Sequence, residues 1–337
     1  MQFRFTSPLL CFISVFLAAL FSACTPSVPQ EATVTNFPVE VRQQVELPED
    51  FISPRVMTSA AKLDACTLLL TEFRTKALYY AGLCEPGLQQ ISRIGTEPGE
   101  YISPMRTWSA DGLIGLTDHG ESQFIIYEAD GSLRHHLFYG DTPGKWFTYA
   151  PHSPWLYRTN AGMYLMRRDN LETNQAHLHF LLPEPFQVFS MVVPGGGIQR
   201  IGDRIFTMSS LMPFIYVFDE STEETSYLHP DFMALGLNST TLTDYTFEDQ
   251  NDFLADIRSF QQYNNLLVLE QGGEPHLLVS YTYQGGYWLG LITQEGETIL
   301  HQQSDYFVIG TFGDALIAVD LETEELFLLD IHFDKLL

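Results

Sequence analysis

Basic residues are scarce in this chain. Lys and Arg together number 17 against 42 Asp and Glu, which gives a formal net charge of −25 over 337 residues. Lysine itself occurs only at Lys62, Lys76, Lys145 and Lys335. Without a basic stripe to neutralise phosphates, the chain is not expected to bind nucleic acid. Direct adsorption to anionic lipid is disfavoured for the same reason.

The N-terminal apolar run is too short to span a bilayer. It extends over 9–21, about 13 residues, whereas a spanning helix needs about 20. This length is typical of the apolar region of a signal peptide. Small residues, Ser22 and Ala23, directly precede Cys24. We therefore predict a lipoprotein signal peptide at 1–23 and lipid attachment at Cys24. The alternative is an ordinary secretory signal with an incidental cysteine.

Lipid on Cys24 predicts a protein held at the cell envelope. Two or three acyl chains anchor a protein firmly, whereas one chain does not. Thr25 follows the cysteine in place of Asp, and by resemblance to the sorting rules of enteric-type bacteria this favours the outer membrane. The folded part would then face the periplasm or the cell surface. Residues 24–48 are rich in Pro, Val, Gln and Glu, and we interpret them as a tether.

Cysteine is rare, with four residues in the chain. Cys11 leaves with the signal peptide and Cys24 carries lipid, so Cys66 and Cys84 remain. An even pair in an oxidising compartment indicates a disulfide. Strand-like runs lie on both sides of Thr75, and a hairpin folded about this residue would place the two cysteines opposite each other. The alternative is a pair of buried free thiols.

Helical periodicity is also scarce. Short runs rich in Val, Ile, Leu, Phe and Tyr recur between Gly, Asp, Asn and Pro, which is the pattern of strands and turns. The units repeat about every 40 to 50 residues, as in a β-propeller. We predict an all-β fold over 49–337, a six-bladed β-propeller of four-stranded antiparallel blades. The alternative fold is a pair of β-sandwiches.

Two parts of the predicted ring need further assignment. The interval between the turns near Ser221 and Gly296 is too long for one plain blade, so it contains an insertion at about 230–262 or a seventh blade. The last unit runs out of chain, and a strand from 32–41 could supply its missing edge and close the ring. Apolar runs are expected to be the innermost strands, at 113–117, 163–166, 204–208, 277–281 and 315–319.

One segment resembles a known family. Residues 91–104 contain Pro98, Gly99, Glu100 and Tyr101 in succession. This segment resembles the six-bladed propeller lipoproteins of Bacteroidota-type bacteria, which are NHL/TolB-like. Glu97 stands where that family usually has glycine. The resemblance implies a six-bladed fold and an envelope lipoprotein, and the motif itself implies turn geometry and no chemistry.

Aromatic residues are concentrated in a Pro-punctuated segment at 146–158. Exposed rings beside hydrogen-bonding groups suit a sugar or a protein partner. The candidate binding residues are Trp146, Tyr149, His152, Trp155, Tyr157 and Arg158. The alternative role for these residues is packing between blades.

Signatures of metal chemistry are weak. CxxC, HExxH and GxSxG patterns are missing from the sequence, and no cofactor is expected. His177 and His179 would share a strand face, whereas His135 and His136 would not; packing is the favoured role for both pairs. A calcium site or an amphipathic helix could explain one acidic stretch, with the helix favoured: Asp244, Glu248, Asp249, Asp252 and Asp256.

The predicted function is binding of an unknown ligand, or of a protein or glycan partner, at the cell envelope. The alternative is a propeller hydrolase or lyase with a metal-assisted site in the central channel. Such an enzyme needs acids and bases that converge on the axis from several blades. The expected innermost strands are mostly apolar, with Asp118 and His119 as the one adjacent acid and base. A structural subunit of an envelope complex is a third alternative.

Overall fold

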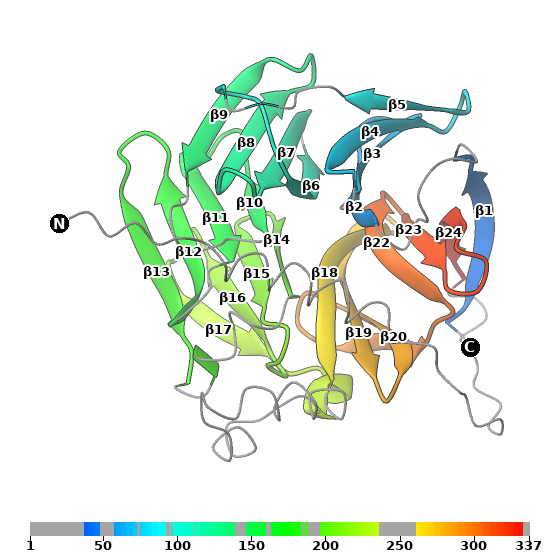
Figure 1. Cartoon of the computed structure of the whole chain (residues 1–337). Coiled ribbons are helices and arrows are strands. Elements are labelled where there is room, and N and C mark those ends of the chain that lie inside the picture. Colours follow the sequence, from blue (N-terminus) through cyan, green and yellow to red (C-terminus); the bar gives the residue numbers. More distant parts are fainter. Residues whose placement is uncertain are drawn as a thin grey trace, which may run out of the picture. The chain divides into compact units, whose positions relative to one another are not determined.

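The computed structural model describes residues 37–47, 57–72, 75–91, 97–110, 112–138, 146–159, 163–183, 196–235 and 261–332, together with Gly95 and 186–187. The described strands form six four-stranded antiparallel sheets in a ring, which is a six-bladed β-propeller (Figure 1). The predicted fold class is therefore confirmed. In the part of the chain that the structure describes, no helix is long and apolar enough to cross a membrane.

The first three blades each follow the chain from the innermost strand outward. Blade 1 consists of β2 (Met57–Lys62), β3 (Thr67–Glu72), β4 (Ala77–Gly82) and β5 (Gly87–Ile91). Blade 2 consists of β6 (Pro104–Ala110), β7 (Leu113–Asp118), β8 (Gln123–Glu128) and β9 (Leu133–Phe138). Blade 3 consists of β10 (Phe147–Tyr149), β11 (Trp155–Thr159), β12 (Tyr164–Asn170) and β13 (Ala176–Leu181).

The last three blades include the closure of the ring. Blade 4 consists of β14 (Gly197–Ile201), β15 (Arg204–Met208), β16 (Ile215–Asp219) and β17 (Thr225–Leu228), followed by the 3-10 helix η2 (Asp231–Leu235). Blade 5 consists of β18 (Gln262–Gln271), β19 (Glu274–Tyr283), β20 (Gly286–Ile292) and β21 (Thr298–Gln303). Blade 6 consists of β22 (Tyr306–Phe312), β23 (Ala315–Asp320), β24 (Leu326–Ile331) and β1 (Val39–Val45).

The two ends of the described chain share blade 6. Strand β1 pairs antiparallel with β24, from Val39 opposite Ile331 to Val45 opposite Leu326. The closing strand thus begins later than the predicted 32–41. Figure 1 shows the blue β1 beside the red β24. Such pairing makes β1 the outer strand of blade 6 and covers the edge of β24.

An apolar cluster fills each of the six junctions between blades. On β3, Leu68 and Leu70 pack towards blade 6, while Leu69 packs towards blade 2. Successive side chains of a strand point to opposite faces, so a strand buried on both faces reads as an uninterrupted apolar run. Close approach also selects glycine: a Cβ on Gly310 of β22 would lie 2.1 Å from the carbonyl oxygen of Ala60 in blade 1.

The runs predicted to be innermost strands are the second or third strands of their blades, so this prediction is wrong. Four of the five runs form second strands (β7, β15, β19 and β23), and 163–166 overlaps the third strand β12. The innermost strands are β2, β6, β10, β14, β18 and β22. Second strands are the most apolar because neighbouring blades cover both their faces, whereas the innermost strands border the central cavity.

The motif that carries the family resemblance links blade 1 to blade 2. Gly99 has a positive φ of 86°, which a glycine adopts without steric cost. A carboxylate oxygen of Glu100 accepts a hydrogen bond from the Glu97 backbone N–H at 3.0 Å. Tyr101 is fully buried, and its hydroxyl donates to the Ile91 carbonyl oxygen. The segment is thus a structural connection.

A disulfide joins Cys66 and Cys84, with their Cα atoms 5.1 Å apart. The hairpin register differs from a fold about Thr75, because Thr67 lies opposite Gly82 and Glu72 lies opposite Ala77. Its centre therefore falls between residues 74 and 75. The Leu83 N–H donates to the Cys66 carbonyl oxygen at 2.7 Å, so Leu83 is the residue opposite Cys66. The disulfide therefore joins Cys66 to the residue that follows Leu83.

Candidate functional site

A cavity of about 1040 Å³ lies on the axis of the propeller, and the innermost strands of all six blades line it. Its charged side chains come from four blades. Blade 1 contributes Lys62, blade 2 Arg106, blade 4 Arg200, Asp203 and Glu220, and blade 5 Glu270. Three of the four tryptophans of the chain also line it, namely Trp108, Trp146 and Trp155.

The innermost strands run in one direction along the cavity. The Thr107 N–H donates to Ser59 Oγ at 3.1 Å, and the Ser109 hydroxyl donates to the Lys62 carbonyl oxygen, so β2 and β6 advance together. Between blades 5 and 6, Asn265 Nδ2 donates to the Val308 carbonyl oxygen at 2.9 Å. Further along in the same direction, the Glu270 N–H donates to the Gly313 carbonyl oxygen at 3.0 Å. The first turns of the blades therefore gather at one end, which we call the mouth.

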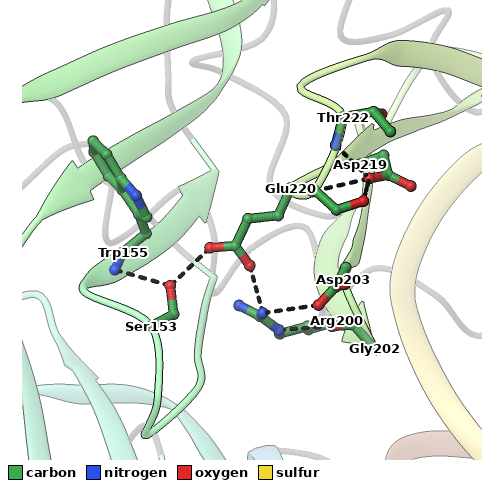
Figure 2. A network of polar contacts seen from close by, with 9 residues as sticks. Ser153, Trp155, Arg200, Gly202, Asp203, Asp219, Glu220 and Thr222 are labelled. Carbon is green, nitrogen blue, oxygen red and sulfur yellow. Dashed lines mark hydrogen bonds and ion pairs between the residues drawn. The ribbon is translucent and has the colours of Figure 1, made fainter.

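A polar network links blades 3 and 4 at the mouth (Figure 2). Ser153 Oγ donates to Glu220 Oε1 at 2.7 Å and accepts the Trp155 N–H at 3.1 Å. Arg200 Nη2 donates to Glu220 Oε2 at 2.5 Å. Arg200 Nε also donates to the Gly202 carbonyl oxygen at 2.9 Å. The Glu220 carboxylate thus fixes the connection between β10 and β11 against blade 4.

Arg106 lies deeper in the cavity than Lys62. Its guanidinium carbon is 4.1 Å from the centroid of the Trp146 ring, a cation–π contact across blades 2 and 3. Burial lowers the pKa of Arg106 to about 10, because desolvation disfavours the charged form. At the mouth, the Lys62 ammonium lies 4.9 Å from the centroid of the Phe312 ring.

The structure separates the six predicted binding residues into two groups. Trp146, Tyr149, His152 and Trp155 are at the cavity wall. Tyr157 and Arg158 are fully buried between blades, where Arg158 Nε donates to Asp169 Oδ2 at 2.8 Å. A ligand in the cavity therefore does not touch the last two. Trp146 and Tyr149 are themselves mostly buried, so packing accounts for much of their surface.

Trp155 contacts its own blade. Its ring turns away from the Glu220 network in Figure 2. The Arg168 guanidinium carbon lies 4.6 Å from the ring centroid, and the His177 ring meets the indole edge-on with centroids 5.4 Å apart. This side chain holds β11, β12 and β13 together. Its part in ligand binding stays a prediction.

Several charged residues of the cavity wall were not predicted from the sequence to lie in a binding site. Lys62, Arg106, Arg200, Asp203 and Glu270 come from different strands and share no motif. A weak signal exists, because Lys62, Arg106 and Arg200 are among only 17 basic residues in the chain and all three lie within strands. Their convergence depends on which strand of each blade is innermost, and local sequence does not encode this.

The histidine pairs serve in packing. His135 Nε2 is 3.3 Å from the Tyr149 hydroxyl, while His136 Nε2 meets Gln123 Oε1 from the other face of β9. The ring centroids of His179 and Phe218 are 4.7 Å apart. Among the described residues, no group of three or more His, Cys, Asp and Glu side chains is arranged to hold a metal ion.

Asp118 is not among the residues that line the cavity, and it lies at the end of blade 2 opposite to the mouth, because it pairs with Pro104 at the start of β6. Its carboxylate accepts the backbone N–H of Ser103 at 2.6 Å and of Gly120 at 3.0 Å. It also accepts Gln123 Nε2 at 2.8 Å. Asp118 therefore stabilises a turn. Cys24 and the acidic stretch at 244–256 lie outside the described residues, as does most of the predicted insertion.

Comparisons with known proteins identify the fold. No protein-family model matches the chain, and no curated protein matches it. A Bacteroides fragilis protein described as exported has a TM-score of 0.65 and 15% identity, over 90% of this chain and 98% of that one. A member of the DUF4221 family from Bacteroides vulgatus has a TM-score of 0.59 and 11% identity, over 88% and 100%. A streptogramin B lyase has a TM-score of 0.52 and 9% identity, over 90% and 100%. The chain is thus similar in fold to these proteins, and identities this low carry no activity to it.

Proposed function

We propose that this chain is a ligand-binding propeller of the bacterial cell envelope, with the central cavity as its binding site. The observation that carries the proposal is the cavity itself. All six blades contribute to it, and its volume of about 1040 Å³ is at the upper end of the usual range for small-molecule sites, about 300 to 1,000 Å³. A pocket of this kind can enclose a ligand of several hundred daltons.

The charge of the cavity wall supports the proposal. Three cations and three carboxylates line the cavity, whereas 17 basic residues face 42 acidic ones in the whole chain. The proportion of basic residues is therefore higher at the cavity wall than in the chain as a whole, and the two signs of charge balance there. Charged groups in a partly desolvated cavity interact more strongly than on an open surface, so they can select the ligand.

Two observations support the location at the envelope. The N-terminal segment has the pattern of a lipoprotein signal, with Cys24 as the predicted site of lipid attachment. In addition, one protein of similar fold is described as exported. We infer an outer-membrane lipoprotein whose propeller faces the periplasm or the cell surface. A protein or glycan partner at that surface remains part of the proposal.

The experiment measures thermal unfolding of the Cys24→Ser protein beginning at residue 24. It is tested against a panel of oligosaccharides, short peptides, calcium and zinc. A ligand that binds the native state raises the unfolding temperature in a concentration-dependent way. Thr311 lines the cavity and is partly exposed, so Thr311→Trp should narrow the cavity and hinder a ligand in it. Thr225→Trp on the exposed outer strand β17 is the matched control.

The outcomes separate the candidate functions. Stabilisation by one ligand class that Thr311→Trp abolishes and Thr225→Trp preserves supports the cavity as the binding site. Stabilisation unaffected by Thr311→Trp places the site elsewhere on the molecule. Turnover of the bound ligand, measured on the same samples, would support the alternative hydrolase or lyase function. A panel without any stabilising member would contradict a small-ligand site and favour a protein partner.

A further inference from the structure

Aromatic rings form a continuous row on the outer strands of blades 3 and 4. Phe180 of β13 packs on Tyr216 of β16, with ring centroids 4.6 Å apart, and Tyr216 lies directly opposite Tyr227 of β17. The ring centroid of Phe214, which precedes β16, is 6.0 Å from that of Tyr216 and 6.2 Å from that of Tyr227. The His229 ring meets Phe214 and Tyr227 edge-on, with centroids 4.7 Å apart in each case. We call these five residues the aromatic row.

The aromatic row reaches the surface on β17. Tyr227 is 61% exposed and His229 is also exposed, whereas the other three rings are partly buried and support them. A large exposed ring that is held between neighbouring rings is typical of a contact surface. None of the five residues lines the central cavity. The row is therefore a surface separate from the cavity.

The backbone at Phe180 supports a role for the row beyond the packing of β13. Its φ is 59°, in the left-handed region that a bulky side chain rarely adopts. Such a conformation is unfavourable and persists only where the surrounding structure fixes it. Strand β13 pairs with β12 on both sides of this position, through His179 and Leu181. The strand thus continues through the strained residue, whose ring lies against blade 4.

The chemistry of the row favours a neutral sugar as its ligand. The two outer strands, β13 and β17, contain no Asp, Glu, Lys or Arg. The exposed polar groups of the row are a phenol and an imidazole, which can both donate and accept hydrogen bonds. A ring face can pack against the C–H groups of a sugar while the polar edge meets its hydroxyl groups. A stable protein interface needs about 20 to 30 residues a side, far more than this row contains.

We propose that the aromatic row binds a neutral oligosaccharide, with one sugar ring stacked on Tyr227 and its hydroxyl groups hydrogen-bonded to the imidazole of His229. This rests on the proposed function only for the glycan partner at the envelope, and it adds a site that does not depend on the cavity. Phe214 and Tyr216 hold the two exposed rings in place before the sugar binds. Such preorganisation reduces the entropy lost on binding.

The test is isothermal titration calorimetry of the Cys24→Ser protein with maltohexaose, cellohexaose, mannohexaose and the anionic hexagalacturonate. We expect a neutral hexasaccharide to bind and the anionic one to fail, because the net charge is −25 and the two outer strands offer no Lys or Arg. Tyr227→Ala should weaken that binding about tenfold, since it removes the stacking ring. Tyr227→Phe should retain most of the binding because the ring face remains.

Phe138→Ala is the matched control. Phe138 is also 61% exposed on an outer strand, β9, and its ring contacts His136, so its loss should leave sugar binding unchanged. Sugar binding that Thr311→Trp abolishes and Tyr227→Ala preserves would overturn the inference and support the cavity as the site. Binding of no hexasaccharide would overturn the inference and leave the cavity open to the other ligands of the panel. A dimer in sedimentation velocity that Tyr227→Ala converts to a monomer would also overturn it, in favour of an interface between two copies of the chain.

Discussion

At the scale of single residues, burial decides how the side chains of blade 3 behave. His179 is half-buried on β13 and packs against Phe218. Burial lowers the pKa of His179 from 6.5 to about 4, and the charges of Arg168 and His177 act in the same direction. The neutral imidazole is therefore the form that the folded protein prefers.

This residue should make the protein sensitive to acid. Because the folded pKa is below the unfolded one, the unfolded state binds more protons between about pH 6.5 and 4. The free energy of unfolding should therefore decrease as the pH falls through this window. His179→Leu should reduce that decrease, as measured by urea unfolding at pH 7 and pH 4.5. His152→Gln, at an exposed histidine, is the control. An identical pH dependence in His179→Leu and the parent protein would contradict the assignment.

At the scale of elements, the hairpin of β3 and β4 carries the disulfide. The bridge joins the residue before β3 to a residue in the turn after β4, at the open end of the hairpin, and the two cysteines are separated by 18 positions. In the unfolded chain a bridge across such a loop removes conformational entropy worth about 3 kcal/mol. Its contribution is therefore to the free energy of unfolding of blade 1, and neither cysteine is among the residues that line the cavity.

Removing the bridge should destabilise the protein without changing its cavity. The Cys66→Ser/Cys84→Ser protein is expected to lose about 2 to 4 kcal/mol of unfolding free energy, measured by urea denaturation. Ligand binding in the cavity should remain once the temperature is well below the transition. The parent protein under reducing conditions should show the same loss. An unchanged stability in both cases would mean that the unfolded chain is already constrained near these residues.

At the scale of the whole molecule, β1 determines whether the ring closes. It supplies the outer strand of blade 6 from the opposite end of the described chain, with six residue pairs between Val39 and Val45 on β1 and their partners on β24. Val45 also belongs to the apolar cluster between blades 6 and 1. Loss of β1 would expose the edge of β24 and open this junction.

Deletion of residues before Glu46 should therefore lower the unfolding temperature and promote association through the free edge of β24. A milder variant, Val45→Asp, places a charge in the same apolar cluster and should lower stability by several kcal/mol. Calorimetry and light scattering measure the two effects. Val41→Asp is the control, because Val41 is exposed on the same strand. Full stability after the deletion would show that the ring closes without β1.

The sequence by itself determined the all-β class and the repeating four-stranded unit, because strand alternation, turn residues and the spacing of the units are local properties of the chain. It left a seventh blade open, and the six sheets came from the tertiary structure. The approximate pairing of Cys66 with Cys84 follows from the same local pattern, although the hairpin register shifted it by one position. Only the tertiary structure decided which strand of each blade is innermost. Apolar character marks burial on both faces and says nothing of distance from the axis, so the second strands were mistaken for the cavity wall. The convergence of Lys62, Arg106 and Asp203 likewise depends on ring closure, which brings residues from distant parts of the sequence to one cavity.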